Sequence, residues 1–267
     1  MNDIIVCGGD KRFYHMCCFL VDYGFSVKWL FAEKYPSDES FIERESYNIS
    51  NPYALVLPLP FSRDNHTLNT PFSEKKILIS DLDFSDKYTV LFTSDDRIDG
   101  INYFKDETVI IDNARLTAVG LLKEIFSYEK EDILGKNALV TGYGRVSQQV
   151  CDILMKNGIK VTAAARNESQ RHLAATRGIS ALEITGAAKN LGEYDYVINT
   201  VPEKLFEGSD IEKTDRKTVF FELASGLMEK SLQREKTYID CKGMPGKHTP
   251  KSAGRVIADF VSGKLRE

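Results

Sequence analysis

The sequence predicts an α/β fold with two domains, each built on a parallel sheet. Short apolar runs of strand length recur along the 267 residues, far enough apart for parallel strands joined by crossovers. Two of these runs, one at the N-terminus and one near the middle, end in a glycine turn that leads into an amphipathic stretch. The length is enough for one large or two medium domains with a sizeable core.

Composition and charge are those of an ordinary globular protein. Apolar residues make up 42% of the chain and the net charge is −4, with the signs mixed, so we expect neither nucleic-acid nor membrane binding. The first residues, MNDIIVCGGD, enter a strand directly, so we expect no signal peptide. The five cysteines and four histidines show no zinc-ligand spacing. We therefore expect a reduced, cytoplasmic protein without a metal.

Residues 1–112 are predicted to form an N-terminal α/β domain. It starts as a βαβ unit, with a helix between the first two strands and a turn at Gly8-Gly9-Asp10. This turn is an alternative nucleotide site, but Asp10 stands where a phosphate would lie and would repel it. The predicted strands are Asp3–Cys7, Ser26–Phe31, Ala54–Leu57, Lys76–Ser80, Thr89–Phe92 and Thr108–Asp112.

A long helix at residues 113–130 is predicted to connect this domain to a second one at residues 131–250. Apolar residues from Ala118 to Phe126 lie on one face of this helix, as in a helix that packs between two domains. Residues 242–250 are expected to be a loop by composition. Residues 251–267 are expected to be a closing helix that packs on the first domain.

The centre of the second domain is residues 137–166. A short strand, Ala138–Val140, leads into Gly142-Tyr143-Gly144, then an amphipathic stretch, then a second strand at Ile159–Ala163. This is the size and order of a dinucleotide-binding βαβ unit. Ser147 takes the third glycine position of G-x-G-x-x-G and is small enough to keep the helix close to the strand. A parallel α/β unit with an empty crevice is the alternative interpretation.

Cofactor choice is predicted from the end of that second strand. A site for NAD usually has an acid there to hold the ribose 2′-hydroxyl. The sequence instead has three alanines followed by Arg166, a cation where a 2′-phosphate would lie. We therefore expect NADP rather than NAD, unless Arg166 is a solvated loop arginine.

Further strands are predicted at the remaining apolar runs of this domain, and the residues at their ends are expected to face a ligand. The strands are Ile179–Leu182, Asp195–Asn199, Thr218–Leu223 and Thr237–Asp240. The predicted cofactor contacts are Gly142, Tyr143, Gly144, Arg145, Val146, Arg166, Thr200, Val201, Pro202 and Ala224.

Short motifs spread from end to end of the chain carry a family resemblance. They are Gly8-Gly9-Asp10 with Arg12, Gly142-Tyr143-Gly144-Arg145, Ala165-Arg166, Ile198-Asn199-Thr200-Val201-Pro202, Leu223-Ala224-Ser225, Gly243-Met244-Pro245-Gly246 and Pro250-Lys251-Ser252-Ala253-Gly254. With these motifs the chain resembles the A subunit of dipicolinate synthase from spore-forming Firmicutes. The first turn and the proline-glycine tail are the specific marks, whereas the middle motifs occur in many dehydrogenases.

The resemblance implies an architecture similar to the D-2-hydroxyacid dehydrogenases, with two Rossmann-like domains and NADP in the C-terminal one. It implies an oxidoreductase subunit that acts in sporulation, on a branch of the lysine pathway, together with a flavoprotein-like B subunit. The reaction it implies is oxidation of a dihydrodipicolinate-type dicarboxylate to dipicolinate. We also expect a homo-oligomer.

Substrate and catalytic residues are predicted around the strand ends. Arg12, together with Asp10, is expected to hold a substrate carboxylate, unless the two form only a salt bridge. Lys251 is a second cation for that role, although a helix N-terminus favours anions without it. Ser225 is expected to hydrogen-bond a ligand or to cap a turn. His248 is the best available proton acceptor, with an exposed loop histidine as the alternative.

Two other functions compete with this prediction. A hydroxyacid or amino-acid dehydrogenase of similar build needs a histidine with a carboxylate partner, and the loop around His248 contains no acid. The other is an NADP-binding module without chemistry. Titration with NADP alone, followed by addition of partner and substrate, separates the three.

Overall fold

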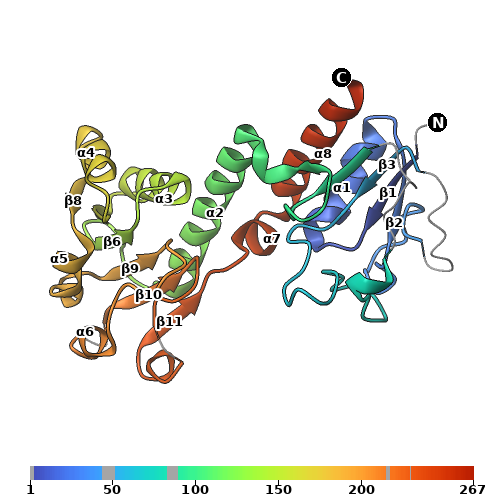
Figure 1. Cartoon of the computed structure of the whole chain (residues 1–267). Coiled ribbons are helices and arrows are strands. Elements are labelled where there is room, and N and C mark those ends of the chain that lie inside the picture. Colours follow the sequence, from blue (N-terminus) through green and yellow to red (C-terminus); the bar gives the residue numbers. More distant parts are fainter. Residues whose placement is uncertain (1–2, 44–51, 83–89, 215–216, 229) are drawn as a thin grey trace. The chain divides into compact units, whose positions relative to one another are not determined.

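The computed structural model describes residues 3–43, 52–82, 90–214, 217–228 and 230–267 (Figure 1). The chain forms two compact units: unit 1 comprises Met1–Asn113 and Pro245–Glu267, and unit 2 comprises Ala114–Met244. Each unit holds one sheet, and every strand pairing in both is parallel. The predicted fold class, α/β with two parallel sheets, is confirmed.

Unit 1 contains a five-stranded sheet in the order β2-β1-β3-β4-β5. The strands are β1 (Asp3–Cys7), β2 (Ser26–Leu30), β3 (Ala54–Val56), β4 (Val90–Thr93) and β5 (Ile101–Asn102). The strand order reverses between β1 and β3, and open α/β sheets bind ligands outside the carboxyl ends of the strands at such a point.

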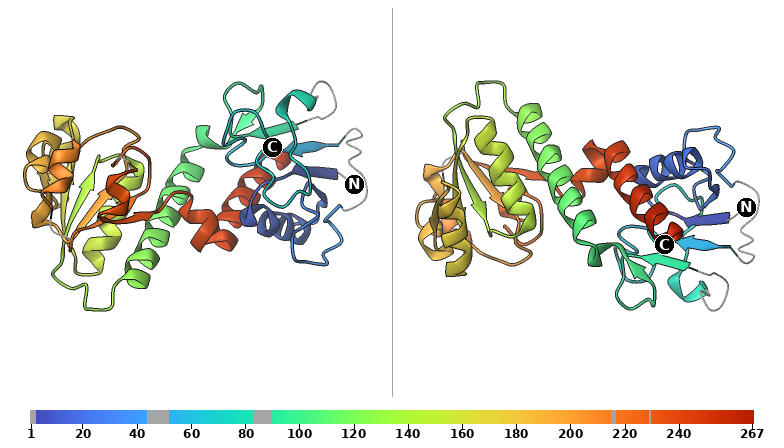
Figure 2. Two further views of the ribbon diagram at one scale, coloured as in Figure 1. Left: turned by 90° about the horizontal axis from the view of Figure 1, so that it is seen from below. Right: turned by 90° about the horizontal axis from the view of Figure 1, so that it is seen from above.

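The two faces of the unit 1 sheet are covered differently. Helices α1 (Lys11–Asp22) and α8 (Pro250–Arg266) lie side by side over one face, where Val6, Phe13 and Ile257 share a core cluster (Figure 2). On the other face, alternate strand residues such as Ile5 pack against Leu68 from the long connection between β3 and β4. That connection therefore forms part of the wall around the strand ends.

The predicted strand Thr108–Asp112 is wrong, because these residues lie in the first turns of α2 (Glu107–Tyr128). Asp106 Oδ1 accepts hydrogen bonds from the backbone N–H groups of Thr108 (2.9 Å) and Val109 (3.1 Å). This carboxylate cap fixes a helix start and outweighs the strand preference of the β-branched run.

The predicted strand Lys76–Ser80 is also wrong. Leu78 makes only an isolated antiparallel bridge to Thr67, and η1 (Ile79–Asp81) is a short 3-10 turn. The apolar run pairs with a neighbouring loop segment rather than with the sheet. The sheet edge is taken instead by β5, which is only two residues long and was not predicted.

Unit 2 contains a six-stranded sheet in the order β8-β7-β6-β9-β10-β11, which is the order of dinucleotide-binding domains. The strands are β6 (Asn137–Thr141), β7 (Lys160–Ala164), β8 (Ser180–Leu182), β9 (Tyr196–Asn199), β10 (Val219–Glu222) and β11 (Thr237–Asp240). All six predicted strands of this unit are confirmed, with ends that shift by a residue. The order reverses between β6 and β9.

Helices cover both faces of the unit 2 sheet. One core cluster joins residues of α2, α3 (Arg145–Lys156) and α4 (Glu168–Thr176) to alternate strand residues such as Val140 and Ile198. The opposite cluster joins α5 (Ile184–Ala188) and α6 (Gly208–Glu212) to the residues in between, such as Leu139 and Val197. The remaining 3-10 turns are η2 (Tyr103–Lys105), η3 (Leu191–Glu193) and η4 (Leu232–Arg234).

Residues 242–250, predicted to be a loop, contain the short helix α7 (Met244–His248). Pro245 does not disrupt it, because proline in a first helical turn loses no hydrogen bond. Within the described ranges, no helix has the length and apolar character needed to cross a membrane.

Candidate functional site

A hollow of about 430 Å³ opens at the carboxyl edge of the unit 2 sheet. The loops after β6, β7 and β9 surround it, so it lies where the strand order reverses between β6 and β9. The predicted cofactor contacts that line it are Gly142, Tyr143, Gly144, Arg145, Val146, Arg166, Thr200, Val201 and Pro202. Ala224, also predicted, is not among its lining residues, which include Ser147, Asn167, Gln170 and Ile184 as well.

The two glycines of the turn after β6 differ in the reason a glycine suits each position. Gly142 has a φ of +78°, and a Cβ there would lie 2.9 Å from Val201 Cγ2, so only glycine fits without strain. Gly144 has ordinary backbone angles, and a Cβ on it would meet no described atom within 4 Å. Space is therefore kept open directly above the backbone of Gly144.

Helix α3 starts directly after Gly144, its N-cap residue. A glycine offers no side-chain acceptor to the first N–H groups of the helix, and no side chain caps the helix at this position. Backbone donors at a helix N-terminus and the positive end of the helix dipole make a site for an anion. A pyrophosphate group therefore fits the turn both sterically and electrostatically.

Ser147 and Tyr143 fix the turn from below. Ser147 is 1% exposed and its Oγ donates to the Gly144 carbonyl at 3.1 Å, so a small residue lets the helix sit close to the sheet. The Tyr143 ring belongs to the hydrophobic core of unit 2, with Val150 and Cys151. Tyr143 therefore lines the hollow through its backbone.

Arg166 follows β7 at the rim of the hollow. Its Nη2 donates to Glu203 Oε2 at 2.7 Å, and the two side chains are 63% and 55% exposed. No acid stands at the end of β7, where Ala164 and Ala165 precede the arginine. Arg166 therefore lies at the strand end where the sequence placed it, and its side chain is paired with the Glu203 carboxylate.

A buried hydrogen-bond chain crosses the sheet just below the hollow. Thr141, Asn199 and Glu222 are the last residues of β6, β9 and β10, stand in register, and are at most 1% exposed. Thr141 Oγ1 donates to Asn199 Oδ1 at 2.6 Å, and Asn199 Nδ2 donates to Glu222 Oε1 at 2.8 Å.

The same three side chains hold the loops above them. Thr141 Oγ1 accepts from the N–H of Thr200 at 3.2 Å, and Asn199 Oδ1 accepts from the N–H of Val201 at 3.1 Å. Glu222 accepts from backbone N–H groups of the loop after β10, including that of Leu227 at 2.8 Å. Both oxygens of the Glu222 carboxylate therefore accept hydrogen bonds, and these bonds hold the loops around the hollow in place.

Sequence reasoning did not predict a role for Glu222 or Thr141. Glu222 ends an otherwise apolar strand run, Val219–Glu222, and a lone acid at the end of a buried strand was the available signal. What it contacts depends on the register of three strands. The pattern within one strand could not reveal this.

In unit 1, the predicted substrate residues Asp10 and Arg12 form a closed ion pair. Arg12 Nε and Nη2 donate to the two Asp10 oxygens at 2.8 and 2.9 Å, and Arg12 is 7% exposed. Arg12 Nη2 also donates to the carbonyl of Leu59 in the loop after β3. Asp10 Oδ1 caps α1 by accepting the N–H of Arg12 at 3.0 Å. These groups thus join the loops after β1 and β3.

Two glycines of the C-terminal motifs pack against this pair and its helix. A Cβ on Gly246 would lie 2.6 Å from Asp10 Oδ2, and one on Gly254 would lie 2.5 Å from the carbonyl oxygen of Arg12. The first-turn motif and the tail motif of the family resemblance are therefore in direct contact within unit 1.

The remaining predicted residues lie at element ends. His248 is the partly exposed last residue of α7, and Lys251 is an exposed residue in the first turn of α8. Burial lowers the pKa of the His15 imidazole, and the positive charge of Lys251 lowers it further. Ser225 is exposed in the loop after β10. Among the described residues, no group of three His, Cys, Asp or Glu side chains forms a metal site.

Comparisons with known proteins give one consistent result. Residues 3–99 match the family model of the N-terminal domain of the dipicolinate synthase A subunit. The A subunit of dipicolinate synthase from Bacillus subtilis (strain 168) is 22% identical over 232 residues, 80% of this chain and 78% of the relative. The predicted resemblance to this family is confirmed.

Solved structures agree on the fold. The A subunit of dipicolinate synthase from Bacillus halodurans superposes with a TM-score of 0.83 at 21% identity, covering 100% of this chain and 98% of that one. A putative D-3-phosphoglycerate dehydrogenase from Ralstonia solanacearum superposes with a TM-score of 0.52 at 14% identity, covering 99% and 96%. The predicted similarity to two-domain dehydrogenase architecture is therefore confirmed at the level of the fold.

Proposed function

We propose, from the resemblance to the A subunit of dipicolinate synthase, that this chain is the NADP-binding oxidoreductase subunit of such an enzyme. The observation that carries the proposal is the uncapped N-terminus of α3 on the Gly142-Tyr143-Gly144 turn, facing a hollow at the switch point of a dinucleotide-type sheet. The reaction is oxidation of a dihydrodipicolinate-type dicarboxylate to dipicolinate during sporulation. The partner in this reaction is the B subunit of the synthase.

The residues present fit the cofactor. Backbone N–H groups at Gly144 and the first turn of α3 would hold the pyrophosphate, and Arg166 would pair with the 2′-phosphate in place of Glu203. The nicotinamide, when bound, supplies the hydride acceptor. Thr200 and Val201 are held rigidly by Thr141 and Asn199, so this chain orients whatever lies against them.

The oxidation requires groups that hold two carboxylates and a base that takes one proton. A dihydropyridine loses a hydride and a proton to become an aromatic pyridine, so the gain of aromaticity supplies much of the driving force. His248 is proposed as the proton acceptor, and the alternative source of the base is the B subunit. Lys251 and Ser225 are proposed substrate contacts, and so are Arg12 and Asp10 unless their salt bridge is only structural. The closed pair of Arg12 and Asp10 favours a role in shaping the site.

Calorimetric titration of the isolated chain with NADP and with NAD tests the cofactor assignment. Arg166→Ala should weaken NADP by about tenfold to a hundredfold, because a charge-assisted contact to phosphate is worth about 1.5–3 kcal/mol, and should leave NAD nearly unchanged. Equal losses for both cofactors would contradict the role of Arg166.

Reconstitution of the chain with its partner, in the presence of NADP and the reduced dicarboxylate, tests the reaction. Dipicolinate formation supports the proposal. NADP binding without turnover would indicate a binding module instead. Turnover of a hydroxyacid or amino acid without a partner would indicate a dehydrogenase of similar architecture.

A further inference from the structure

A second hollow, of about 280 Å³, lies in unit 1. It shares no lining residue with the hollow at the carboxyl edge of the unit 2 sheet. Three cations line it, Arg63, Lys75 and Lys76, against one acid, Glu74. Asn69 and Ser73, both at least nine-tenths buried, contribute polar groups to its wall. The lining therefore carries a net positive charge of two, from three cations less one carboxylate.

The hollow adjoins the strand ends of the unit 1 sheet. The carbonyl of Asn69 accepts the N–H of Gly9 at 2.8 Å, in the turn directly after β1. A Cβ on Gly8 would lie 2.6 Å from Thr70 Cγ2, so the wall of the hollow is packed tightly onto that turn. This is the point where the strand order reverses between β1 and β3 and where open α/β sheets place their ligands.

Hydrogen bonds join two neighbouring chain segments that line the hollow. The N–H of Leu68 donates to the carbonyl of Ile77 at 2.9 Å, and the N–H of Ile79 donates to the carbonyl of His66 at 3.0 Å. These contacts link the segment that bears Arg63 to the segment that bears Lys75 and Lys76.

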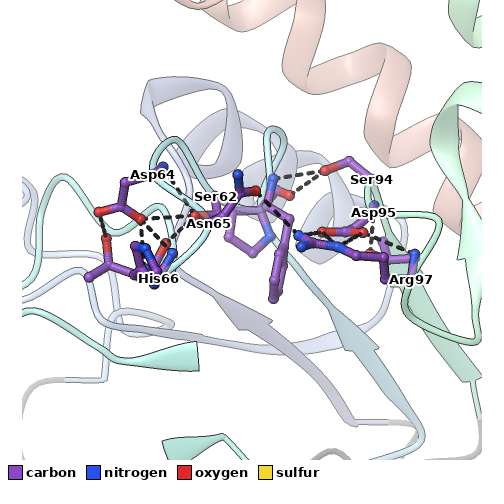
Figure 3. A network of polar contacts seen from close by, with 11 residues as sticks. Ser62, Asp64, Asn65, His66, Ser94, Asp95 and Arg97 are labelled. Atoms are coloured by element: carbon purple, nitrogen blue, oxygen red, sulfur yellow. Dashed lines mark hydrogen bonds and ion pairs between the residues drawn. The ribbon is translucent and has the colours of Figure 1, made fainter. Parts of the chain in front are cut away.

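The turn next to Arg63 is organised by Asp64 (Figure 3). Asp64 Oδ1 accepts from the N–H groups of Thr67 (2.7 Å) and His66 (2.8 Å), and Oδ2 accepts from Thr67 Oγ1 at 2.8 Å. These bonds lower the pKa of Asp64. The backbone N–H groups of Thr67 and His66 contribute most to this shift. The Asp64 carboxylate is therefore hydrogen-bonded by residues of its own turn.

A buried donor without a partner lies in the same wall. Asn69 is 7% exposed, and its Nδ2 has no hydrogen-bond partner among the described residues. An unpaired buried donor is costly, and native structures rarely retain one without a reason. The Nδ2 atom is enclosed, so an anion oxygen would supply the missing acceptor only after a small shift of the wall.

We propose that this hollow binds a small dicarboxylate through Arg63 from one lining segment and Lys75 and Lys76 from the neighbouring one. Cations from two segments can pair with two carboxylates of one ligand, whereas a compact anion such as phosphate would engage only part of the set. That the ligand is the substrate of the reaction rests on the proposed function. Binding of a dicarboxylate rests only on the lining and the unpaired amide.

Calorimetry on the full chain, with neither NADP nor a partner present, tests the site. The probes are pyridine-2,6-dicarboxylate, pyridine-2-carboxylate and inorganic phosphate. The dicarboxylate should bind about tenfold or more tightly than either of the others, because only it can pair two carboxylates with cations from both segments. The variant Lys75→Ala/Lys76→Ala should weaken the dicarboxylate by about tenfold or more.

The matched control is Lys28→Ala/Lys105→Ala, which removes the same charge from exposed positions elsewhere in unit 1. It should bind the dicarboxylate as the unchanged chain does, and circular dichroism should show both variants folded. Equal affinities in the two double variants, or equal binding of phosphate and dicarboxylate, would overturn the proposal. Failure of the proposed function would instead appear as absent turnover or absent NADP binding while the dicarboxylate still binds this hollow.

Discussion

The two units place a glycine turn at the same position, after a strand at the switch point of a parallel sheet and before a helix of 12 residues, but the two turns end differently. In unit 1, Asp10 caps α1 with its own carboxylate. In unit 2, Gly144 precedes α3 and no described side chain caps it. A side chain therefore satisfies one helix N-terminus, whereas no described side chain caps the other.

The two turns also differ in whether the space above them is filled or open. A Cβ on Gly9 would come within 2.3 Å of the Phe13 ring, so the first turn is filled by its own helix. A Cβ on Gly144 would stand clear of all described atoms. A glycine turn therefore predicts an anion site only where the helix N-cap carries no acceptor and the space above it stays open.

Each unit also has an arginine–carboxylate pair near its strand ends. The pair of Arg12 and Asp10 is largely buried, with side chains 8% and 19% exposed. The pair of Arg166 and Glu203 is mostly exposed, at 63% and 55%. We expect the first pair to support the fold and the second to exchange partners when a phosphate arrives.

The largest effect should come from giving the second turn the cap of the first. Gly144→Asp should abolish NADP binding, since a carboxylate would occupy the helix N-terminus and repel the pyrophosphate. The fold should be kept or gain a few tenths of a kcal/mol, because aspartate is a slightly better N-cap than glycine. Calorimetry with NADP, alongside thermal unfolding, measures both effects.

A neutral control separates charge from bulk. Gly144→Ala adds only a Cβ, into space that is open without ligand, and should weaken NADP less than aspartate does. If Gly144→Asp bound NADP normally, the cofactor site would have to lie elsewhere.

Breaking the buried pair should cost stability. Arg12→Ala leaves the Asp10 carboxylate without its partner and removes the bond to the Leu59 carbonyl, so the free energy of unfolding should fall by about 2–4 kcal/mol. Arg97→Ala is the matched control, since Arg97 pairs with Asp95 at the same spacing but is exposed (Figure 3). Urea unfolding of both variants gives the comparison.

Activity of Arg12→Ala in the reconstituted complex then decides between two roles. Normal dipicolinate formation by a destabilised variant would establish that Arg12 is structural. A raised KM with unchanged stability would restore it as a substrate contact.

Close packing of α8 on α1 should be sensitive to one methyl group. Gly254→Ala would put a Cβ 2.5 Å from a backbone oxygen of α1, and overpacking of this kind costs about 1–3 kcal/mol. Gly263→Ala, on the same helix, meets nothing described within 4 Å and should stabilise the protein by about 0.5–1 kcal/mol. Opposite shifts in melting temperature would confirm that the tail motif is a packing motif, and equal shifts would contradict it.

The sequence predicted the unit 2 sheet well because its signals are local. Each strand there is a short apolar run, and the turn residues Gly142 and Gly144 stand next to the strand they follow. In unit 1 the same kind of run was misleading at Thr108–Asp112, where the cap by Asp106 decides for a helix. Lys76–Ser80 was misleading because its pairing partner is a loop.

Contacts between distant residues could not be predicted in this way. Asn199 and Glu222 meet only because their strands are in register, and Arg12 reaches Leu59 only because β1 and β3 are neighbours. The residues that line the unit 2 hollow could be predicted separately, from the loop that follows each strand. The buried chain that shapes it, and the cations of the second hollow, required the fold.

The smallest expected effect concerns the exposed pair at the rim of the unit 2 hollow. Glu203→Gln removes the charge that competes with a 2′-phosphate for Arg166, while keeping the size of the side chain. An exposed ion pair is worth less than about 1 kcal/mol, so NADP should bind up to about fivefold more tightly, with NAD unchanged. The gain should shrink at high salt, because screening weakens exposed pairs. In the Arg166→Ala background the same substitution should have no effect, and a gain that persisted there would mean that Glu203 repels the cofactor directly rather than through Arg166.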